Sequence, residues 1–376
     1  MSVTTLARPV SHSPSVPAPF LVYRDRIGTP SEIRFLRRQY IGFTRLAPVW
    51  IGRHVMPLAN ELGAPVLRLG GTWLSRALFR QAGIVPHLDV ERTAPVLHAQ
   101  FARGGALALP LARARGLRMV VTLWGGDISK AKNWRGTVQA RRWPQVVAAT
   151  ARFVCVSAAI ADMALTHDVP AEKLTVLPIG AEIPPAPPPA PPAPTCHLFV
   201  GRFVAKKGIQ DMADAVRRLR SEGDATPVVF VGDGPLRPIL ESLARDVSGV
   251  ELTGWLPPEA VQARMAYAWS LLVPSVVAAN GDAEGLPSVL FEGMAQSCAV
   301  IGTNEGGIAE AIQHERTGLL VPPRDPAALA AAMRRLVANP ALRHALAQAG
   351  YDHARRNLNA HTQSVALENL LLEVAA

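Results

Sequence analysis

The sequence predicts two doubly wound α/β domains, each built on a parallel sheet. The chain has 376 residues, which is long for one core and suits two domains of ordinary size. Short apolar runs rich in β-branched residues alternate with longer helical patterns, as expected for parallel strands joined by crossover helices. A proline-rich segment, PPAPPPAPPAP at 184–194, divides the chain near its middle.

The proline-rich segment sets the domain boundaries. Proline lacks the backbone donor and fixes φ, so we expect a polyproline II linker here, with a docking site for a proline-binding partner as the alternative. The domains are then 1–183 and 195–350, followed at 351–376 by a helix that packs back on the first domain. Helical material such as GALALPLARARG separates some of the strands. The expected strands are 95–101, 117–125, 152–159, 173–180, 196–203, 227–234, 250–255, 270–275, 299–304 and 318–323.

Composition narrows the class of protein. Apolar residues make up 49% and charged residues 18%, as in a globular chain. Cys155, Cys196 and Cys298 are distant from one another and show no metal-ligand spacing, so we expect reduced thiols, no disulfide and no zinc. No apolar run approaches the length of a membrane span, and the N-terminus lacks a signal pattern. These features predict a cytoplasmic protein.

The charge is concentrated in the first half of the chain. Residues 1–190 contain 23 Lys and Arg against 10 Asp and Glu, a net charge of +13, whereas residues 191–376 contain 16 against 19, a net charge of −3. This asymmetry favours an anionic partner, although an ordinary basic surface explains it too. Few aromatic residues lie among the arginines and no nucleic-acid-binding signature is present, so we expect no nucleic acid.

Three loops of the second half have features of a ligand site. GRFVAKKGI (201–209) places Arg202 and Lys207 after a strand, where they suit a diphosphate; a solvated basic loop is the alternative. VVFVGDGPLR contains Gly232 and Gly234 in a turn before a helix, a weak signal for close approach of a ligand. LTGWLPPEA adds a turn in which Leu256 is a candidate edge of a base pocket.

The stretch EGLPSVLFE (284–292) places two acids eight residues apart around a helix start. After Gly285, which relaxes the backbone, and Leu286, Pro287 suits the first position of a helix that continues through Ser288. The unpaired amides and the dipole at this helix start favour phosphate. Glu284 precedes those amides and Glu292 lies inside the helix. A ligand with a diphosphate in the middle and hydroxyls at both ends, a nucleotide sugar, suits this arrangement.

Several motifs in order resemble one family. The run PSVVAANGDAEGLPSVLFEGMAQSCAVIGTNEGGIAEAI (274–312), with TGLLVPP, GRFVAKKG and VGDGPLR, resembles retaining glycosyltransferases of the GT-B fold with two glutamates eight apart. The resemblance extends to WGGD (124–127) and VSAAIADMAL (156–165), and spans about residues 95–350. It implies two Rossmann-like domains facing across a cleft, a UDP- or GDP-sugar donor, and no cofactor or metal.

The resemblance also implies roles for individual residues. Arg202 and Lys207 match the cations that hold the donor diphosphate, and Glu284 matches the acid that engages the hydroxyls of the donor sugar. Glu292 matches the acid on the ribose hydroxyls, and Asp127 falls in the loop that lines the reaction centre. The family commonly has a histidine where this chain has Trp124; His98 and Arg135 are candidates for part of its work.

The predictions about the acceptor substrate are based on the distribution of basic residues. SEIRFLRRQYIGF (31–43) is compatible with an amphipathic helix on anionic lipid, or with a first surface helix that buries its apolar side. A second basic cluster, expected to suit a lipid-linked pyrophosphate or to be a solvated helix face, comprises Lys130, Lys132, Arg135, Arg141 and Arg142. We therefore expect a saccharide or lipid-linked acceptor in polysaccharide or glycolipid assembly. The alternatives are a nucleotide-sugar 2-epimerase of the same fold and a non-catalytic nucleotide-sugar-binding protein.

Overall fold

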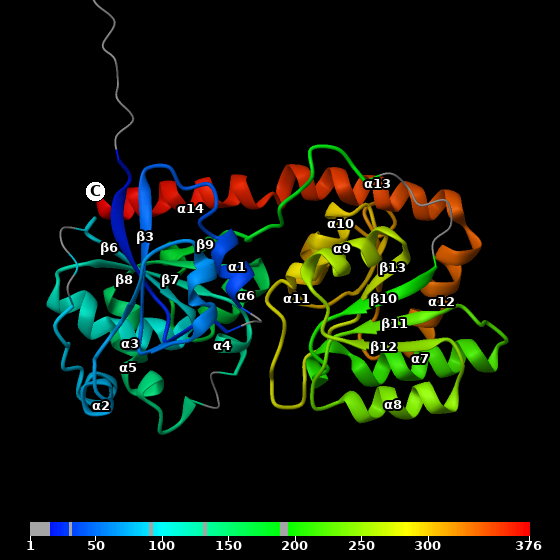
Figure 1. Cartoon of the computed structure of the whole chain (residues 1–376), viewed down its shortest axis with the longest axis horizontal. Coiled ribbons are helices and arrows are strands. Elements are labelled where there is room, and N and C mark those ends of the chain that lie inside the picture. Colours follow the sequence, from blue (N-terminus) through cyan, green and yellow to red (C-terminus); the bar gives the residue numbers. More distant parts are fainter. Residues whose placement is uncertain (1–15, 30–31, 89, 91–92, 131–133, 189–194) are drawn as a thin grey trace, which may run out of the picture.

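Two α/β domains lie side by side in the computed structural model, and a long C-terminal pair of helices runs along both (Figure 1). The structure describes residues 16–29, 32–88, 90, 93–130, 134–188 and 195–376. In these ranges every strand pairs in parallel, in two large sheets and one small pair. The predicted pair of doubly wound domains is confirmed. Part of the predicted proline-rich linker, residues 189–194, lies outside the described residues.

The N-terminal sheet has the strand order β5-β3-β1-β6-β7-β8-β9 among the described residues. Its four later strands lie where the sequence predicts them, because strands buried on both faces are continuous apolar runs. The strands before residue 95 were not predicted. The strands are β1 Ala18–Tyr23, β3 Leu46–Gly52, β5 Val66–Arg68, β6 Val96–Gln100, β7 Arg118–Leu123, β8 Thr150–Cys155 and β9 Leu174–Val176, with β2 Arg26–Ile27 and β4 His54–Val55 paired separately.

The C-terminal sheet has the order β12-β11-β10-β13-β14-β15 in the part of the chain that the structure describes. All of these strands were predicted. The order reverses direction at β10 and β13, and ligands in such sheets bind at this switch point, beyond the carboxyl ends of the strands. The strands are β10 Cys196–Val200, β11 Val228–Val231, β12 Val250–Gly254, β13 Ala268–Val273, β14 Val300–Thr303 and β15 Leu319–Val321.

Helices cover both faces of each sheet. The N-terminal domain contains α1 Ile33–Arg38, α2 Trp73–Ala82, α3 Phe101–Ala114, α4 Gly126–Ser129, α5 Val138–Ala149 and α6 Ala158–Leu165, with short 3-10 helices η1 Pro57–Leu62 and η3 Ala171–Lys173. The C-terminal half contains η4 Ala205–Lys207, α7 Ile209–Ser221, α8 Arg237–Asp246, α9 Pro258–Ala266, α10 Ser288–Ala295, α11 Gly306–Ala311, α12 Pro326–Ala338, α13 Pro340–Asn357 and α14 Ala360–Ala375.

The last two helices belong to different domains. Helix α13 packs on α10, whereas α14 crosses to the N-terminal sheet, where Leu367 and Leu371 join the core around β1, β6 and β7. Buried Glu368 accepts hydrogen bonds from the backbone amides of residues 44, 45 and 46, at 2.9, 2.7 and 2.8 Å. The chain crosses between the domains at residues 358–360, where Leu358 and Ala181 are joined by a backbone hydrogen bond.

Hydrogen bonds between side chains of one domain and the backbone of the other join the two domains. Ser157 at the start of α6 donates to the carbonyl of Gly285 at 3.1 Å. The carboxylate of Glu310, on α11, accepts from the amides of Ala158 and Ala159 at 2.7 Å each. An acid from one domain thus caps a helix of the other, where the helix dipole favours negative charge.

Candidate active site

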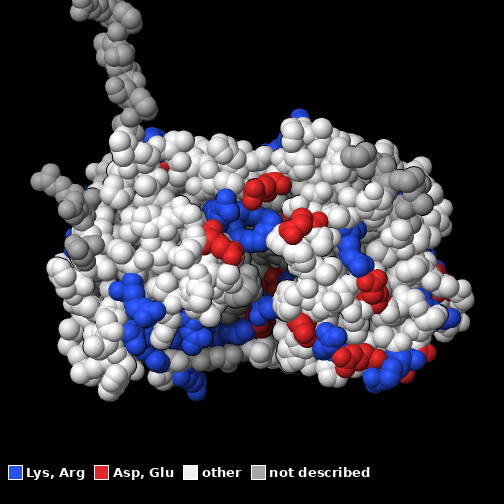
Figure 2. All heavy atoms as spheres, viewed as in Figure 1, with Lys and Arg blue, Asp and Glu red and all other residues white. Residues whose placement is uncertain are grey.

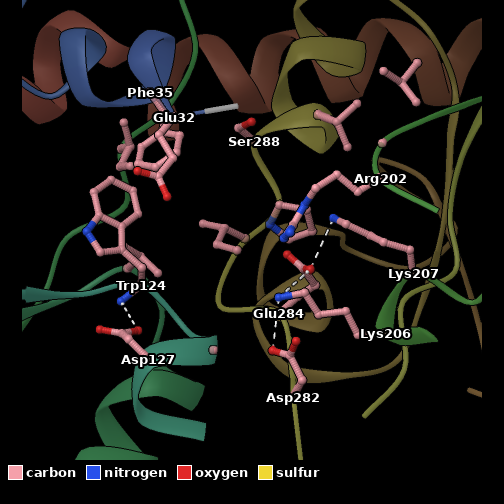
Figure 3. A pocket seen from close by; sticks show the side chains of 18 of the residues that line it. Glu32, Phe35, Trp124, Asp127, Arg202, Lys206, Lys207, Asp282, Glu284 and Ser288 are labelled. Atoms are coloured by element: carbon pink, nitrogen blue, oxygen red, sulfur yellow. Dashed lines mark hydrogen bonds and ion pairs between the residues drawn. The ribbon is translucent and has the colours of Figure 1, made fainter. Parts of the chain in front are cut away.

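A cavity of about 500 Å³ lies between the two domains. Its walls are the loops at the carboxyl ends of β6 and β7 on one side and of β10, β12 and β13 on the other, together with the start of α10. Figure 3 shows the two walls facing each other, with charged side chains from the C-terminal domain opposite aromatic ones. The predicted site residues that line the cavity are Asp127, Arg202, Lys207, Glu284, Leu286, Pro287, Ser288 and Glu292.

Glu284 is the centre of a buried charge cluster. Its Oε1 lies 3.2 Å from Nζ of Lys207 and 3.1 Å from Nζ of Lys206. Lys206 also pairs with Asp282 at 3.2 Å (Figure 3). Lys130 of the N-terminal domain pairs with the same Asp282 at 2.6 Å. The cluster therefore fixes Glu284 on the cavity wall and connects it to the opposite domain.

The two ammonium groups keep Glu284 ionised. Burial by itself raises the pKa of this carboxyl, because a charge is costly away from water. The Coulombic attraction of Lys207, then that of Lys206, outweighs burial and lowers the pKa to about 2. Glu284 is thus an anion at neutral pH, able to accept hydrogen bonds and unable to donate one.

Arg202 and Lys207 leave strand β10 in the order that the sequence predicts. Arg202 is exposed at the cavity, whereas the Lys207 side chain is 13% exposed and closes the short 3-10 helix η4. The chain turns tightly here: a Cβ on Gly208, whose φ is +68°, would lie 2.0 Å from the carbonyl oxygen of Pro274. This turn keeps Lys207 directed at the cavity (Figure 3).

Glu292 carries an unexpected partner. The Nη1 of Arg38, at the end of α1, lies 2.5 Å from Oε1 of Glu292, and Arg38 is 3% exposed. The pair joins the two domains across the cavity, 254 residues apart in the chain. The interpretation of the 31–43 segment as a lipid-facing helix is wrong for Arg38, and Ile33 and Leu36 are buried in the core. The alternative, a surface helix with a buried apolar side, is confirmed.

Asp127 has a positioning geometry. One carboxylate oxygen accepts from the amides of Trp124 and Gly125 at 3.0 and 2.9 Å, and the other accepts from Ala102 at 2.8 Å. Burial raises the pKa of this carboxyl, and the three backbone hydrogen bonds partly offset the rise. Asp127 therefore ties the loop after β7 to the start of α3, and both of its oxygens are already engaged.

The N-terminal wall of the cavity is aromatic. The ring centroids of Phe35 and Trp124 are 4.6 Å apart, and Phe101 stacks on Trp124 at 5.6 Å with an interplanar angle of 27°. Phe101 has a φ of +70°, a strained value for a residue with a side chain. The guanidinium of Arg24 lies over the Phe101 ring at 3.9 Å and binds Glu32 at 2.6 Å. Together these contacts hold the aromatic group in place.

Four predicted residues lie outside the cavity lining. Gly285 is buried in the domain contact, where a Cβ would lie 2.1 Å from the carbonyl oxygen of Trp124. Gly232 and Gly234 pack against Gly201 and Phe203, behind the cationic loop. Leu256 joins the core of the C-terminal domain. Direct contact of these four with a ligand stays a prediction.

The candidate replacements for the family histidine are also elsewhere. His98 is fully buried between the hydroxyls of Tyr40 and Thr122, at 2.8 and 2.7 Å, and burial lowers its pKa to about 3. It is a neutral, satisfied core residue. Arg135 is exposed outside the cavity lining. In the basic cluster, Lys130 faces the cavity, Arg141 and Arg142 lie elsewhere, and Lys132 is outside the described residues.

Sequence reasoning missed two residues of the C-terminal wall. Lys206 is 9% exposed, and its neighbour Lys207 was the lysine that the family pattern indicated. Trp255 lines the cavity with 60% of its surface exposed. The doubled lysine was visible in the sequence, but only the contacts with Asp282 and Glu284 show that both face one acid.

Comparison with known proteins identifies both halves. The family model described as "Glycosyl transferases group 1" matches residues 195–339, and the one described as "Glycosyl transferase 4-like domain" matches residues 23–180. The amylovoran biosynthesis glycosyltransferase AmsK of Erwinia amylovora is 30% identical over 255 residues, 65% of this chain and 61% of that protein. The putative colanic acid biosynthesis glycosyltransferase WcaL of Escherichia coli is 36% identical over 169 residues, covering 43% of this chain and 41% of WcaL.

Solved structures have the same fold at low identity. Anabaena Alr3699/HepE, solved in complex with UDP-glucose, superimposes with a TM-score of 0.75 at 14% identity, over 95% of this chain and 100% of that one. Sucrose-phosphate synthase from Thermosynechococcus elongatus gives a TM-score of 0.71 at 19% identity, over 95% and 99%. These likenesses confirm the GT-B architecture. This chain therefore belongs to the glycosyltransferases, with a 4-like domain in its first half and a group 1 domain in its second.

Proposed function

We propose that this chain transfers a sugar from a UDP- or GDP-sugar to a saccharide or lipid-linked acceptor, with retention at the anomeric carbon, in polysaccharide or glycolipid biosynthesis. The observation that carries the proposal is the cavity, in which a cationic loop and an ionised acid face an aromatic wall across the domain cleft. The relatives are named as glycosyltransferases of amylovoran and colanic acid biosynthesis, which favours transfer over epimerisation.

The donor has a place on the C-terminal wall. Arg202 and Lys207 supply two cations for the diphosphate, and the start of α10 at Ser288 supplies unpaired amides. Glu284 accepts hydrogen bonds from hydroxyls of the donor sugar, and Lys206 holds the Glu284 side chain in position. Glu292, about one turn into α10, accepts a hydrogen bond from the ribose once its ion pair with Arg38 breaks. Gly232 and Gly234 act indirectly, because they allow the cationic loop to pack closely.

The carboxylates of the site favour a mechanism without a protein nucleophile. Among the described residues of the lining, each acid already has partners: Glu32, Asp127, Asp282, Glu284 and Glu292. The acceptor oxygen then attacks the anomeric carbon on the face that the diphosphate leaves, and its proton passes to the departing phosphate oxygen. Arg202 and Lys207 stabilise the charge on that leaving group, while Asp127 positions the loop of Trp124.

Substitution of the two cations tests this mechanism. Arg202→Ala should fold normally, whereas Lys207→Ala should fold with reduced stability because it leaves Glu284 paired with Lys206 alone. Both should lower turnover by about 10²–10³-fold, because each removes a donor to the leaving group. The assay is release of nucleoside diphosphate from a panel of UDP- and GDP-sugars in the presence of acceptor saccharides. Arg245→Ala, exposed on α8, is the matched control. Unchanged turnover in either site variant would refute the assignment.

Metal independence follows from the same two cations. If they neutralise the diphosphate, activity should persist in EDTA and should not rise on addition of Mg²⁺ or Mn²⁺. No group of three His, Cys, Asp or Glu able to hold a metal occurs in the described ranges. Loss of activity in EDTA with recovery on metal addition would contradict this part of the proposal.

The aromatic wall favours a saccharide at the acceptor end. The apolar face of a pyranose stacks on aromatic rings, and Glu32 beside Phe35 and Trp124 provides an acceptor for sugar hydroxyls. Trp124→Ala should raise the acceptor KM and leave donor hydrolysis without acceptor nearly unchanged. The donor-only reaction also separates the alternatives: an epimerase converts the donor without acceptor, and a non-catalytic binding protein converts nothing.

We place the reaction in the cytoplasm, with the enzyme peripheral on the membrane where its acceptor is lipid-linked. The basic first half supports this placement, because anionic lipid attracts clustered arginines. In the described parts of the chain, no helix has the length and hydropathy to cross a membrane.

A further inference from the structure

Helix α2 presents its apolar side to solvent. Trp73 is 74% exposed, Leu74 52% and Leu78 39%, and Ile84 just beyond the helix is 56% exposed. These four lie within twelve residues of one another, whereas large exposed apolar residues elsewhere in the described chain are scattered. Single exposed apolar residues are ordinary, but a contiguous group marks an interaction surface.

The sequence of α2 forms a helix without help from the core. Thr72 and Ser75 make a reciprocal capping box at its start, and Gly83, with a φ of +76°, ends it in the left-handed conformation. Within α2, all of whose residues are described, Phe79 alone is fully buried. At about 100° per residue, Leu74 and Leu78 lie roughly 100–140° around the helix from Phe79. One aromatic thus anchors the helix while its leucines point outward.

Arginines lie beside helix α2. A second cavity, of about 180 Å³, lies between α2, α3 and the start of α5, and its lining includes Arg80, Arg103 and Arg141. Arg141 reaches across to Gln81 of α2 at 3.2 Å. Figure 2 shows lysine and arginine side chains gathered over this lower part of the N-terminal domain, where Figure 1 places α2, α3 and α5. Arginines thus gather beside the helix that carries the exposed apolar residues, and one of them, Arg103, also pairs with Asp25 at 3.4 Å.

Helix α1 does not offer the same surface. Its Ile33 and Leu36 are buried, and Arg38 is paired with Glu292 in the domain cleft. Helix α14 covers that face of the sheet, whereas α2 packs on α3 on the opposite face. Of α1 and α2, the helix whose apolar side is exposed is α2.

We propose that α2 docks this chain on an anionic phospholipid bilayer. Trp73, Leu74, Leu78 and Ile84 enter the interface between headgroups and acyl chains, where tryptophan is enriched, and the arginines of the neighbouring cavity bind lipid phosphates. The net charge of residues 1–190, +13 from 23 basic and 10 acidic residues, favours an anionic surface over a protein partner of mixed charge. This proposal can be tested independently of the proposed glycosyl transfer, because vesicle binding is measured without any reaction.

Vesicle sedimentation tests the proposal directly. The full chain should bind phosphatidylcholine vesicles that contain phosphatidylglycerol, and should bind pure phosphatidylcholine weakly. The double variant Trp73→Ser/Leu74→Ser should bind about tenfold or more weakly, because two side chains no longer bury apolar surface. Arg80→Gln should bind about fivefold more weakly on anionic vesicles only. Tryptophan fluorescence of the wild type should shift to the blue on binding.

Matched variants separate docking from general effects. Leu165→Ser removes a leucine that is 46% exposed on α6, and Arg245→Gln removes an exposed arginine on α8; both should bind as the wild type does. Thermal unfolding should be unchanged in all four, since the replaced side chains are exposed. Absence of vesicle binding, or equal binding by the α2 variants, would overturn the proposal. A dimer that Trp73→Ser/Leu74→Ser dissolves, without vesicle binding, would assign the surface to a second copy instead.

Discussion

Replacing Glu284 with glutamine should destabilise the protein by about 3 kcal/mol at neutral pH and by much less in acid. The reason is the pair of ammonium groups, which lowers the pKa of Glu284 from 4.5 in a free side chain to about 2. That difference in pKa corresponds to roughly 3 kcal/mol in the free energy of unfolding at a pH where Glu284 is ionised in both the folded and the unfolded chain. Glutamine keeps the shape of the side chain and removes the charge.

The pH dependence gives the sharper test. Between pH 4.5 and about 2, Glu284 is protonated in the unfolded chain and still ionised in the folded chain. The stability that its charge contributes is therefore complete above this pH range and is lost as pH falls through it. The difference between wild type and Glu284→Gln should therefore be nearly constant from pH 7 to 5. At pH 3 the part of this difference that depends on the charge of Glu284 should be about 1 kcal/mol.

The assay is hydrogen exchange of C-terminal-domain peptides during urea unfolding, because two domains need not unfold together. The control is Glu259→Gln, an exposed glutamate on α9, which changes the net charge equally and should follow the wild type within about 0.5 kcal/mol. A wild-type minus Glu284→Gln difference that stays constant from pH 7 to 3 would refute the reasoning, since Lys206 and Lys207 would then not hold the carboxyl ionised.

Three further outcomes follow from the structure. Gly285→Ala places a Cβ 2.1 Å from the Trp124 carbonyl oxygen, so it should separate the domains and abolish activity; a wild-type scattering profile would contradict this. Arg38→Leu frees Glu292 for a ribose and should tighten nucleotide-sugar binding in calorimetry, whereas weaker binding would mean that Arg38 itself contacts the donor. Burial raises the pKa of Cys155 and of Cys298 to about 12, so native protein at pH 8 should not react with a thiol reagent until it unfolds.

Strands buried on both faces were predictable and strands interrupted by proline were not. From β6 onward each strand is a short apolar run between turns, a pattern that needs no knowledge of its neighbours. By contrast, β1 (APFLVY) and β3 (LAPVWIG) contain prolines, which argue against a central strand. Both strands nevertheless pair in the middle of the sheet, because partners on each side provide enough other hydrogen bonds.

The candidate site was predictable where it is local in the chain. The loop of Arg202 and Lys207 follows a strand, and Glu284 to Glu292 span a loop and one helix, so their chemistry shows in their spacing. The pair of Arg38 and Glu292 joins residues from separate domains, and the aromatic group of Phe35, Phe101 and Trp124 joins separate segments of the N-terminal domain. No spacing encodes such contacts, because they depend on how two finished domains pack.

The sequence by itself determined the two-domain parallel architecture and the cationic and acidic residues of one wall, since periodicity and short motifs record local backbone and side-chain preferences. Only the tertiary structure decided which amphipathic helix is free. The segments 31–43 and 73–84 both combine arginines with apolar residues. In the folded chain the apolar side of the first segment packs in the core, whereas the apolar side of the second segment is exposed to water. Burial depends on which surfaces meet when the domain folds.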